Sequence, residues 1–446
     1  MKTKIIWRIK QGAGQSRKSA IWLLLVTFVI LAVTSSIWGK APAAEKKKAD
    51  MSQLLIIGDS LLAGFQNYSL LGSLQANSIP ALIARQAGVE LAQPLIMEPG
   101  IPPALILVDP GPPPVIIPKA TVPPLWPFRV DPYLQPMNLA VPGHRVLDAL
   151  AIKPPCSFSE ETIMTDVVLG MPGCSMNVFR SQVEWAEALY PSTIIIWIGA
   201  NDSLGAAINA DTLFLTPPMI FEVAYTEMME RLAATGATLV VANIPDVTLI
   251  PFLTSAEDVA ELVGLPLDLI GPLLGIESGD FVTPDAMPLI GAILSEIIPG
   301  PLPDYVVLTA SEVAMIRAYN KTFNDIITTQ AKAKGAALLD AHTFFNRIHE
   351  KGYVVGGQRL TTDFLGGLFS LDGIHLTNTG FAISANKFIK VLNRNFAAGI
   401  PPVNVRQIQK DDPLVLPGVG HPASALKHID AETVKGLRRM FGHENN

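Results

Sequence analysis

A serine near the start of the chain and an aspartate–histidine pair near its end are suited to hydrolytic chemistry. Ser60 lies in LLIIGDSLLAGF, where an apolar run stops at three small or polar residues and then resumes. Asp372 and His375, in FSLDGIHLTNTG, are three residues apart, so a tight loop or one helical turn can present both side chains together. A carboxylate that orients an imidazole is the base half of a hydrolytic triad, and serine is the nucleophile that such a base activates. Each signal is weak alone, because Ser60 could simply cap a helix and Asp-x-x-His pairs are common in loops.

A tetrahedral oxyanion needs preorganised hydrogen-bond donors, and the sequence offers three candidates. They are the backbone N–H of Ser60, the backbone N–H of Gly143 and the side-chain amide of Asn201. Glycine suits a position where the backbone approaches a substrate. The amide of Asn201 is neutral, so it can donate without supplying a competing nucleophile.

The elements that must position these residues alternate between strands and helices. Short apolar runs predict buried strands over 53–57, 138–141, 192–198, 238–243 and 336–340. Periodicity and capping residues predict helices over 80–87, 178–189, 221–234, 311–333, 380–395 and 431–441. This alternation is typical of a parallel sheet covered on both faces.

Polar segments follow three of the predicted strands. They are Gly58-Asp59-Ser60, Pro142-Gly143 and Gly199-Ala200-Asn201-Asp202. Ligands of parallel α/β sheets bind outside the carboxyl ends of the strands, so we expect the three segments to share one rim. Three polar segments expected at one rim are stronger evidence for a binding site than any single motif.

With these blocks in place, the chain resembles the SGNH hydrolases, also called the GDSL esterase/lipase family. The four marker blocks occur in the family's order over roughly residues 53–395: GDSL at 58–61, Gly143, GAND at 199–202 and DGIH at 372–375. The resemblance implies a three-layer α/β/α fold of the flavodoxin-like kind, with a five-stranded parallel sheet.

The resemblance also implies a role for each matching residue. Ser60 would be the nucleophile, His375 the general base and Asp372 the acid that orients it. The oxyanion hole would comprise Ser60, Gly143 and Asn201, while Asp59, Gly199 and Asp202 would support local turns. The implied reaction is two-step ester hydrolysis through an acyl-enzyme, with no metal or cofactor. Two departures are His144 after the second-block glycine, where a small residue is more usual, and Leu376 in place of a proline.

Two long apolar regions interrupt the pattern and are interpreted as insertions. Region 94–136 holds 14 prolines in 43 residues, which excludes helix and central strand, so we expect an extended segment packed on the surface. Region 247–310 has nine acidic residues and no Lys or Arg, and its apolar stripes predict short amphipathic helices. Either region could border the binding cleft, and either could be only a packed loop or structural cap.

The N-terminus has the pattern of a secretory signal. Basic residues precede the uncharged apolar run 20–33, and Ala41-Pro42-Ala43 offers a cleavage site. We therefore expect 1–43 to be a signal peptide or a retained membrane anchor, 44–52 a linker, 53–396 the hydrolase domain and 397–446 a C-terminal extension. The protein would be exported to the periplasm or the medium.

The net charge and the two cysteines are compatible with an exported protein. Residues 1–43 carry seven Lys and Arg and no acid, so their removal changes the formal net charge from −6 to −13. An acidic chain repels phosphate backbones, which argues against a nucleic-acid partner. Cys156 and Cys174 could form one disulfide in an oxidising compartment, or could be two unrelated buried thiols.

Three alternatives remain open at this stage. The substrate would be a small-molecule or lipid-like ester with apolar groups, or else an O-acetyl group on a polysaccharide. A metal-dependent phosphoesterase could use Asp59, Asn201, Asp202, Asp372 and His375 as ligands, although no metal-binding motif supports it. An exported binding protein with an inactive site is the third alternative, and the complete set of triad residues argues against it.

Overall fold

A parallel sheet of four strands carries the candidate site. Its strands lie in the order β1 (Leu54–Gly58), β4 (Thr193–Trp197), β5 (Thr238–Ala242) and β9 (Ala337–Leu339). The first three are buried over their whole length, as apolar runs such as TIIIW predict for strands covered on both faces. The computed structural model describes residues 48–111, 114–416 and 429–441, which belong to one unit that begins at Lys48.

The predicted strand at 138–141 does not become a regular fifth strand. It runs parallel to β1 and meets it through one bridge, at Ile56, and through a hydrogen bond from Val141 N to Gly58 O of 3.1 Å. A regular parallel ladder would also use the Gly58 N–H, but Gln182 Oε1 accepts that hydrogen at 3.0 Å. A side chain replaces a backbone partner here, so the described sheet has four strands rather than the five expected.

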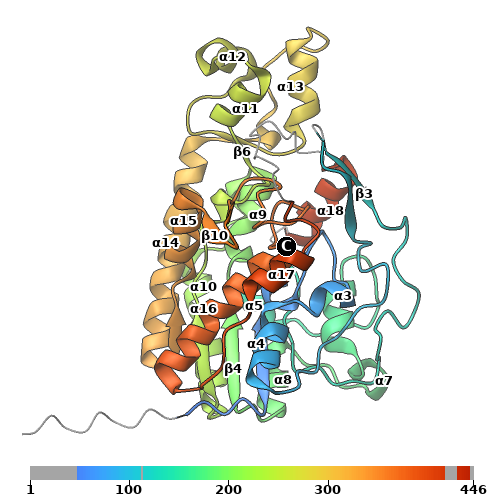
Figure 1. The fold of residues 1–446 in the computed structure, drawn as a ribbon, viewed down its shortest axis with the longest axis vertical. Coiled ribbons are helices and arrows are strands. Elements are labelled where there is room, and N and C mark those ends of the chain that lie inside the picture. The colour runs from blue at the N-terminus through green and yellow to red at the C-terminus, as the bar shows by residue number, and fades with distance from the viewer. Residues whose placement is uncertain (1–47, 112–113, 417–428, 442–446) are drawn as a thin grey trace, which may run out of the picture. The chain divides into compact units, whose positions relative to one another are not determined.

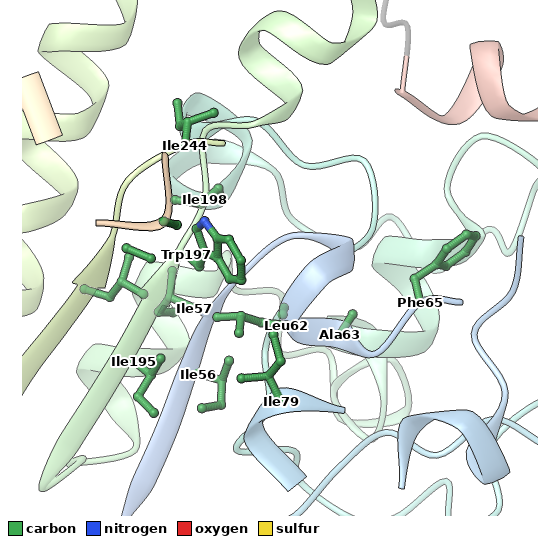
Figure 2. Packing of buried hydrophobic residues seen from close by; sticks show 14 of the residues in the cluster. Ile56, Ile57, Leu62, Ala63, Phe65, Ile79, Ile195, Trp197, Ile198 and Ile244 are labelled. Carbon is green, nitrogen blue, oxygen red and sulfur yellow. The ribbon is translucent and has the colours of Figure 1, made fainter. Parts of the chain in front are cut away.

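Apolar side chains from the sheet and the helices after β1 form the base of the site. Figure 2 shows Ile56 of β1 beside Leu62 of α2 (Ser60–Ala63) and Ile79 of α4 (Ile79–Ala87), with Trp197 of β4 nearby. All four side chains are buried. The Trp197 indole donates to Asn243 O at 3.0 Å, so its one polar atom is satisfied inside the core. This packing fixes where the ends of β1 and β4 lie.

Two groups of helices pack beside the sheet. In the first, α4 contacts α16 (Asn378–Phe396), which also contacts β5 and β9. In the second, α10 (Pro218–Ala234) contacts α5 (Val146–Ala151), α8 (Gln182–Ala188) and α14 (Ala310–Ala333). The predicted helices are present, but that at 178–189 is shorter than expected. Its start is fixed by Ser181, whose hydroxyl accepts from Glu184 N at 3.3 Å as an N-cap.

Region 94–136 is mostly irregular and contains one antiparallel hairpin. Its strands are β2 (Leu105–Asp109) and β3 (Val115–Pro118), which pair outside the central sheet. Several apolar side chains of this region are exposed, among them Val108, Leu125 and Trp126. The absence of helix from its described residues agrees with the proline content.

Region 247–310 forms a small substructure with its own apolar cluster. It contains α11 (Ala256–Val263), α12 (Leu267–Leu274), α13 (Ala286–Leu294) and an antiparallel sheet of β6 (Thr254–Ser255), β7 (Phe281–Val282) and β8 (Val307–Leu308). The three helices group at one end of the molecule (Figure 1). Val259, Ile270 and Leu274 are among the buried residues of the cluster. The predicted short amphipathic helices are thus present.

The C-terminal part beyond α16 holds two helices, α17 (Val405–Asp411) and α18 (Ala431–Phe441). None of the helices in the described ranges combines the length and apolar character needed to cross a membrane. The predicted signal or anchor segment 1–43 lies outside those ranges. A disulfide joins Cys156 and Cys174, whose Cα atoms are 5.8 Å apart.

The remaining elements are short, apart from α9 and α15. They are α3 (Gly72–Gln75), α6 (Ile163–Thr165), the π-helix η1 (Asp166–Gly170), α7 (Gly173–Met176), α9 (Asn201–Asn209), the 3₁₀ turns η2 (Thr212–Phe214), η3 (Val247–Leu249) and η4 (Asp304–Val306), α15 (Ala341–Lys351), and the hairpin of β10 (Tyr353–Val355) with β11 (Gln358–Leu360).

The Gln182 contact predicts a stability effect. Gln182→Leu leaves the buried Gly58 N–H without its acceptor, so the free energy of unfolding should fall by about 1–3 kcal/mol. Urea denaturation measures this. Gln407→Leu is the matched control, because Gln407 is exposed and should change the value by less than about 0.5 kcal/mol. Equal effects of the two substitutions would contradict the structural role of Gln182.

Candidate active site

Ser60 begins α2 immediately after β1. Asp59 caps this helix, and its Oδ1 accepts from Leu61 N at 3.0 Å. The strand end and the cap together fix the position of Ser60. Its side chain is nearly covered, since only 3% of the residue is exposed. The strand–turn–helix arrangement expected from the sequence is therefore the one found.

Asp372 and His375 form a close, buried pair. His375 Nδ1 donates to Asp372 Oδ2 at 3.0 Å, and neither residue is more than 1% exposed. The other carboxylate oxygen, Oδ1, accepts from the backbone N–H groups of Ile374 (2.9 Å) and His375 (2.8 Å). The loop thus folds around the carboxylate and orients the imidazole ring.

Burial alone would raise the pKa of Asp372, because a carboxylate loses solvation inside the protein. The charge and hydrogen bonds of His375 and the backbone N–H of Ile374 outweigh that effect and hold the pKa at about 2. Asp372 therefore remains ionised near neutral pH and can stabilise a positive charge on the imidazole.

A turn far away in sequence completes the environment of this carboxylate. Tyr68 N donates to Asp372 Oδ2 at 2.8 Å. Asn67 accepts from Leu371 N at 3.1 Å, and its backbone N–H donates to Ser370 Oγ at 3.0 Å. Asn67 and Tyr68 both have positive φ, 54° and 62°. Neither residue is predicted from the sequence; the only signal is the asparagine, which tolerates this conformation better than most residues other than glycine.

The two other candidate oxyanion donors are linked to each other. Asn201 begins α9, and its Nδ2 donates one hydrogen to His144 O at 2.9 Å, which leaves a second amide hydrogen. Gly143, the residue before His144, has φ +85°, a conformation that favours glycine. The hydrogen bond therefore ties the amide of Asn201 to the loop that carries Gly143.

Ser60, Asn201 and His375 line one cavity of about 70 Å³. Its other walls are largely apolar, from Trp197, Leu204, Val247, Leu249, Ile250, Phe345, Phe369, Ile374 and Leu376. His375 Nε2 is buried and has no hydrogen-bond partner among the described residues. The candidate nucleophile and the candidate base thus share a cavity, while the hydrogen bond between them is not formed; such bonds often tighten only when substrate binds.

Phe65 and Phe441 flank the imidazole of His375. Their ring centroids lie 4.8 and 5.3 Å from the centroid of the histidine ring. Phe65 comes from the segment after α2, and Phe441 ends α18. The contact of Phe441 with His375 is not predicted from the sequence, because the pattern of the C-terminal helix does not indicate which earlier residue it packs against.

Asp59 lines the small cavity next to Ser60, whereas Asp202 lies beside that cavity. Asp202 Oδ2 accepts from Val146 N at 3.1 Å and so joins α9 to the start of α5. Burial raises the pKa of each carboxyl to about 7, and the proximity of Asp202 adds to the effect at Asp59. Both side chains hold local structure, which fits the supporting role that the resemblance implied.

Gly199 and His144 also have structural roles. Gly199 has φ +117°, a conformation that strains other residues, and a Cβ there would lie 3.1 Å from the Phe221 ring, so both backbone and packing favour glycine after β4. Gln182 Nε2 donates to His144 Nδ1 at 3.1 Å, and the other ring nitrogen lies 3.0 Å from Thr165 Oγ1. His144, the unusual residue of the second block, is therefore buried and hydrogen-bonded through both ring nitrogens.

Within residues 48–111, 114–416 and 429–441, no group of three or more His, Cys, Asp and Glu side chains is arranged to hold a metal ion. Three residues of the ligand set considered for a phosphoesterase, Asp59, Asn201 and His375, line the small cavity, but they do not form such a group in this part of the chain. Asp372 and His375 instead bond to each other.

The family model of the GDSL-like lipase/acylhydrolases matches residues 54–388, and the chain belongs to this family. The protein is therefore a hydrolase that acts on ester bonds. No curated protein matches the sequence significantly. One similar solved structure is LAE5, an α/β hydrolase enzyme from the metagenome of Lake Arreo, Spain. It is 14% identical with a TM-score of 0.35, over 77% of this chain and 96% of that one, a likeness too weak to carry an argument.

The raised pKa values of Asp59 and Asp202 predict how stability depends on pH. Between about pH 4 and 7 the folded protein keeps protons that unfolded carboxyls lose, so the free energy of unfolding should fall as pH rises. Each carboxyl contributes at most about 1.4 kcal/mol per pH unit. Asp59→Asn and Asp202→Asn should each reduce this slope in urea denaturation from pH 5 to 7.5.

Asp50→Asn is the matched control for this titration. Hydrogen bonds from Ser52 lower the pKa of this exposed carboxyl, so any stability it gives is lost only below its ordinary pKa, and the substitution should leave the slope between pH 5 and 7.5 unchanged. If Asp59→Asn and Asp202→Asn also kept the wild-type slope, the two carboxyls would not titrate in this range.

Proposed function

We propose that the protein is a serine hydrolase that cleaves carboxylic esters through an acyl-enzyme on Ser60. One observation carries the proposal: the buried Asp372–His375 pair presents an unpartnered Nε2 to the cavity that also holds Ser60 and Asn201. A carboxylate that orients an imidazole, which in turn shares a cavity with a serine, is the arrangement from which a catalytic triad is built.

In the first step, His375 Nε2 takes the Ser60 proton and the hydroxyl oxygen attacks the ester carbonyl. Asp372 stays ionised and stabilises the imidazolium, which then protonates the leaving alcohol. In the second step, His375 activates a water that attacks the acyl-enzyme and returns the proton to Ser60. The aromatic rings beside His375 keep its surroundings poor in water, which strengthens these electrostatic interactions.

The oxyanion of each tetrahedral intermediate would be held by Ser60 N–H, Gly143 N–H and the free amide hydrogen of Asn201. The Asn201–His144 hydrogen bond supports this assignment, because it fixes the amide before the reaction begins. Preorganised donors of this kind act without reorganisation at the moment of reaction.

The walls of the cavity support esters with apolar groups as substrates. The wall includes Val247, Leu249 and Ile250 from the start of region 247–310. A sugar O-acetyl group would make few contacts with these apolar walls, so we rank polysaccharide deacetylation as the second candidate function. The fold that carries the site would be the three-layer arrangement of the family, with regions 94–136 and 247–310 as insertions.

The serine mechanism predicts the effect of single substitutions. Ser60→Ala should abolish hydrolysis of p-nitrophenyl esters and labelling by a fluorophosphonate, while Asn201→Ala should lower kcat on the order of 10²- to 10³-fold. Ser203→Ala is a control for Ser60, because this second buried serine hydrogen-bonds to Asn320 in the helix layer. Thermal melts show whether each variant is folded.

Other outcomes would select other functions. Hydrolysis that survives in Ser60→Ala but stops with a chelator would favour a metal-dependent phosphoesterase, and a folded wild-type protein without labelling or hydrolysis would favour a binding protein. A sharp preference for acetate among p-nitrophenyl esters would favour the O-acetyl esterase.

We also propose that the protein is exported, either free or anchored by its N-terminal segment. The signal-like pattern of 1–43 and the Cys156–Cys174 disulfide support export, because disulfides persist in oxidising compartments. Intact mass of protein from the periplasm or medium should match a chain that begins near Ala44. An unprocessed chain in the membrane fraction would favour the anchor, and one in the cytosol would contradict export.

A further inference from the structure

A second, much larger cavity lies next to the candidate active site. Its volume is about 1340 Å³. It is lined by region 94–136, by residues 144–165 and by α18. Apolar side chains from all three segments line it, among them Ile101, Phe128, Leu147, Ile152, Phe158 and Met440.

This large cavity reaches the loop that carries Gly143. Pro142 and His144, on either side of Gly143, both line it. Asp202 lines it as well, whereas its neighbour Asn201 lines the small cavity with Ser60. The two cavities share no lining residue, and the candidate oxyanion donors Gly143 and Asn201 lie between them.

The end of α18 lies beside Gly143 and His375. Phe441 packs against His375 and also against Phe65, with ring centroids 6.0 Å apart in the latter pair. Met440 O lies so close to Gly143 that a Cβ on the glycine would be 2.5 Å from it. The last turn of α18 thus covers both the oxyanion loop and the catalytic imidazole.

Polar and apolar contacts hold α18 in this position. Val434, Leu437 and Phe441 are buried. Arg438 donates to Ile208 O at 3.0 Å and pairs with Asp285 at 2.7 Å, which links the helix to α9 and to region 247–310. By contrast, Lys435 points to solvent from the exposed face of the helix.

We propose that the large cavity binds the long apolar arm of the ester. For this arm to extend from Ser60 into the large cavity, α18 must move away from Gly143. The proposal rests on the ester hydrolase function proposed above. A cavity of about 150 Å³ is enough for benzene, so the small cavity of about 70 Å³ has room only for the short arm. An ester with one long chain needs a second space, and the large cavity supplies it.

Substitution in the cavity tests where the chain binds. Ile152→Trp fills part of the large cavity and should lower kcat/KM for p-nitrophenyl laurate on the order of tenfold, while leaving kcat/KM for p-nitrophenyl acetate unchanged. Val354→Trp is the matched control, because Val354 is an exposed residue of β10 away from both cavities. Equal losses on acetate and laurate in Ile152→Trp would overturn the assignment of the cavity.

Loosening α18 tests the movement. Phe441→Ala and Arg438→Ala remove two different contacts of the helix, one apolar and one polar, and should speed labelling by a long-chain fluorophosphonate several-fold, with a smaller effect on a short-chain one. Lys435→Ala should match the wild type. Two variants are used because Phe441 is buried, and a melting curve accompanies each. If both variants fold and label no faster than Lys435→Ala, α18 is a fixed wall and the movement is refuted.

The short-chain probe separates this inference from the proposed function. If the wild type labels with the short-chain fluorophosphonate but Ile152→Trp shows no chain-length effect, only the cavity assignment fails. If neither the wild type nor Phe441→Ala labels with either probe, or if Ser60→Ala labels as well as the wild type, the serine hydrolase function itself fails.

Discussion

The buried carboxylate of Asp372 is the constraint on which the rest of the site depends. A charge without water is costly unless donors surround it, and here the imidazole and three backbone N–H groups do so. One of these groups belongs to Tyr68, which is 304 residues away in the chain. The same contacts that stabilise the charge also set the angle of His375 toward Ser60. The contacts that bury the Asp372 carboxylate therefore also orient His375, the candidate base.

Much of this arrangement follows from local sequence. The strands β1, β4, β5 and β9 and the helices α10, α14, α16 and α18 appear where apolar runs and capping residues predict them, because each is determined by its own residues. The candidate residues Ser60, Asn201 and His375 also share a cavity, as expected from strand ends that meet at one rim.

The remaining features depend on contacts between distant segments. The side chain of Gln182 interrupts the pairing of β1 with the segment at 138–141, a replacement that no strand pattern shows. The donor from Tyr68 is a backbone group, which any residue type could provide. Phe441 belongs to an ordinary amphipathic helix, and only the tertiary fold brings it to the imidazole. Periodicity describes which face of an element is buried but not which partner buries it.

The separation of Tyr68 from Asp372 also bears on when the protein becomes active. Closing so long a loop is entropically costly and occurs only when the intervening sheet is assembled. During synthesis, Ser60 emerges early, yet the imidazole proposed as its base is not oriented until the segment around His375 has been made and docked onto the turn at Tyr68. In the proposed mechanism, the appearance of ester hydrolysis would therefore report that this long-range contact has formed.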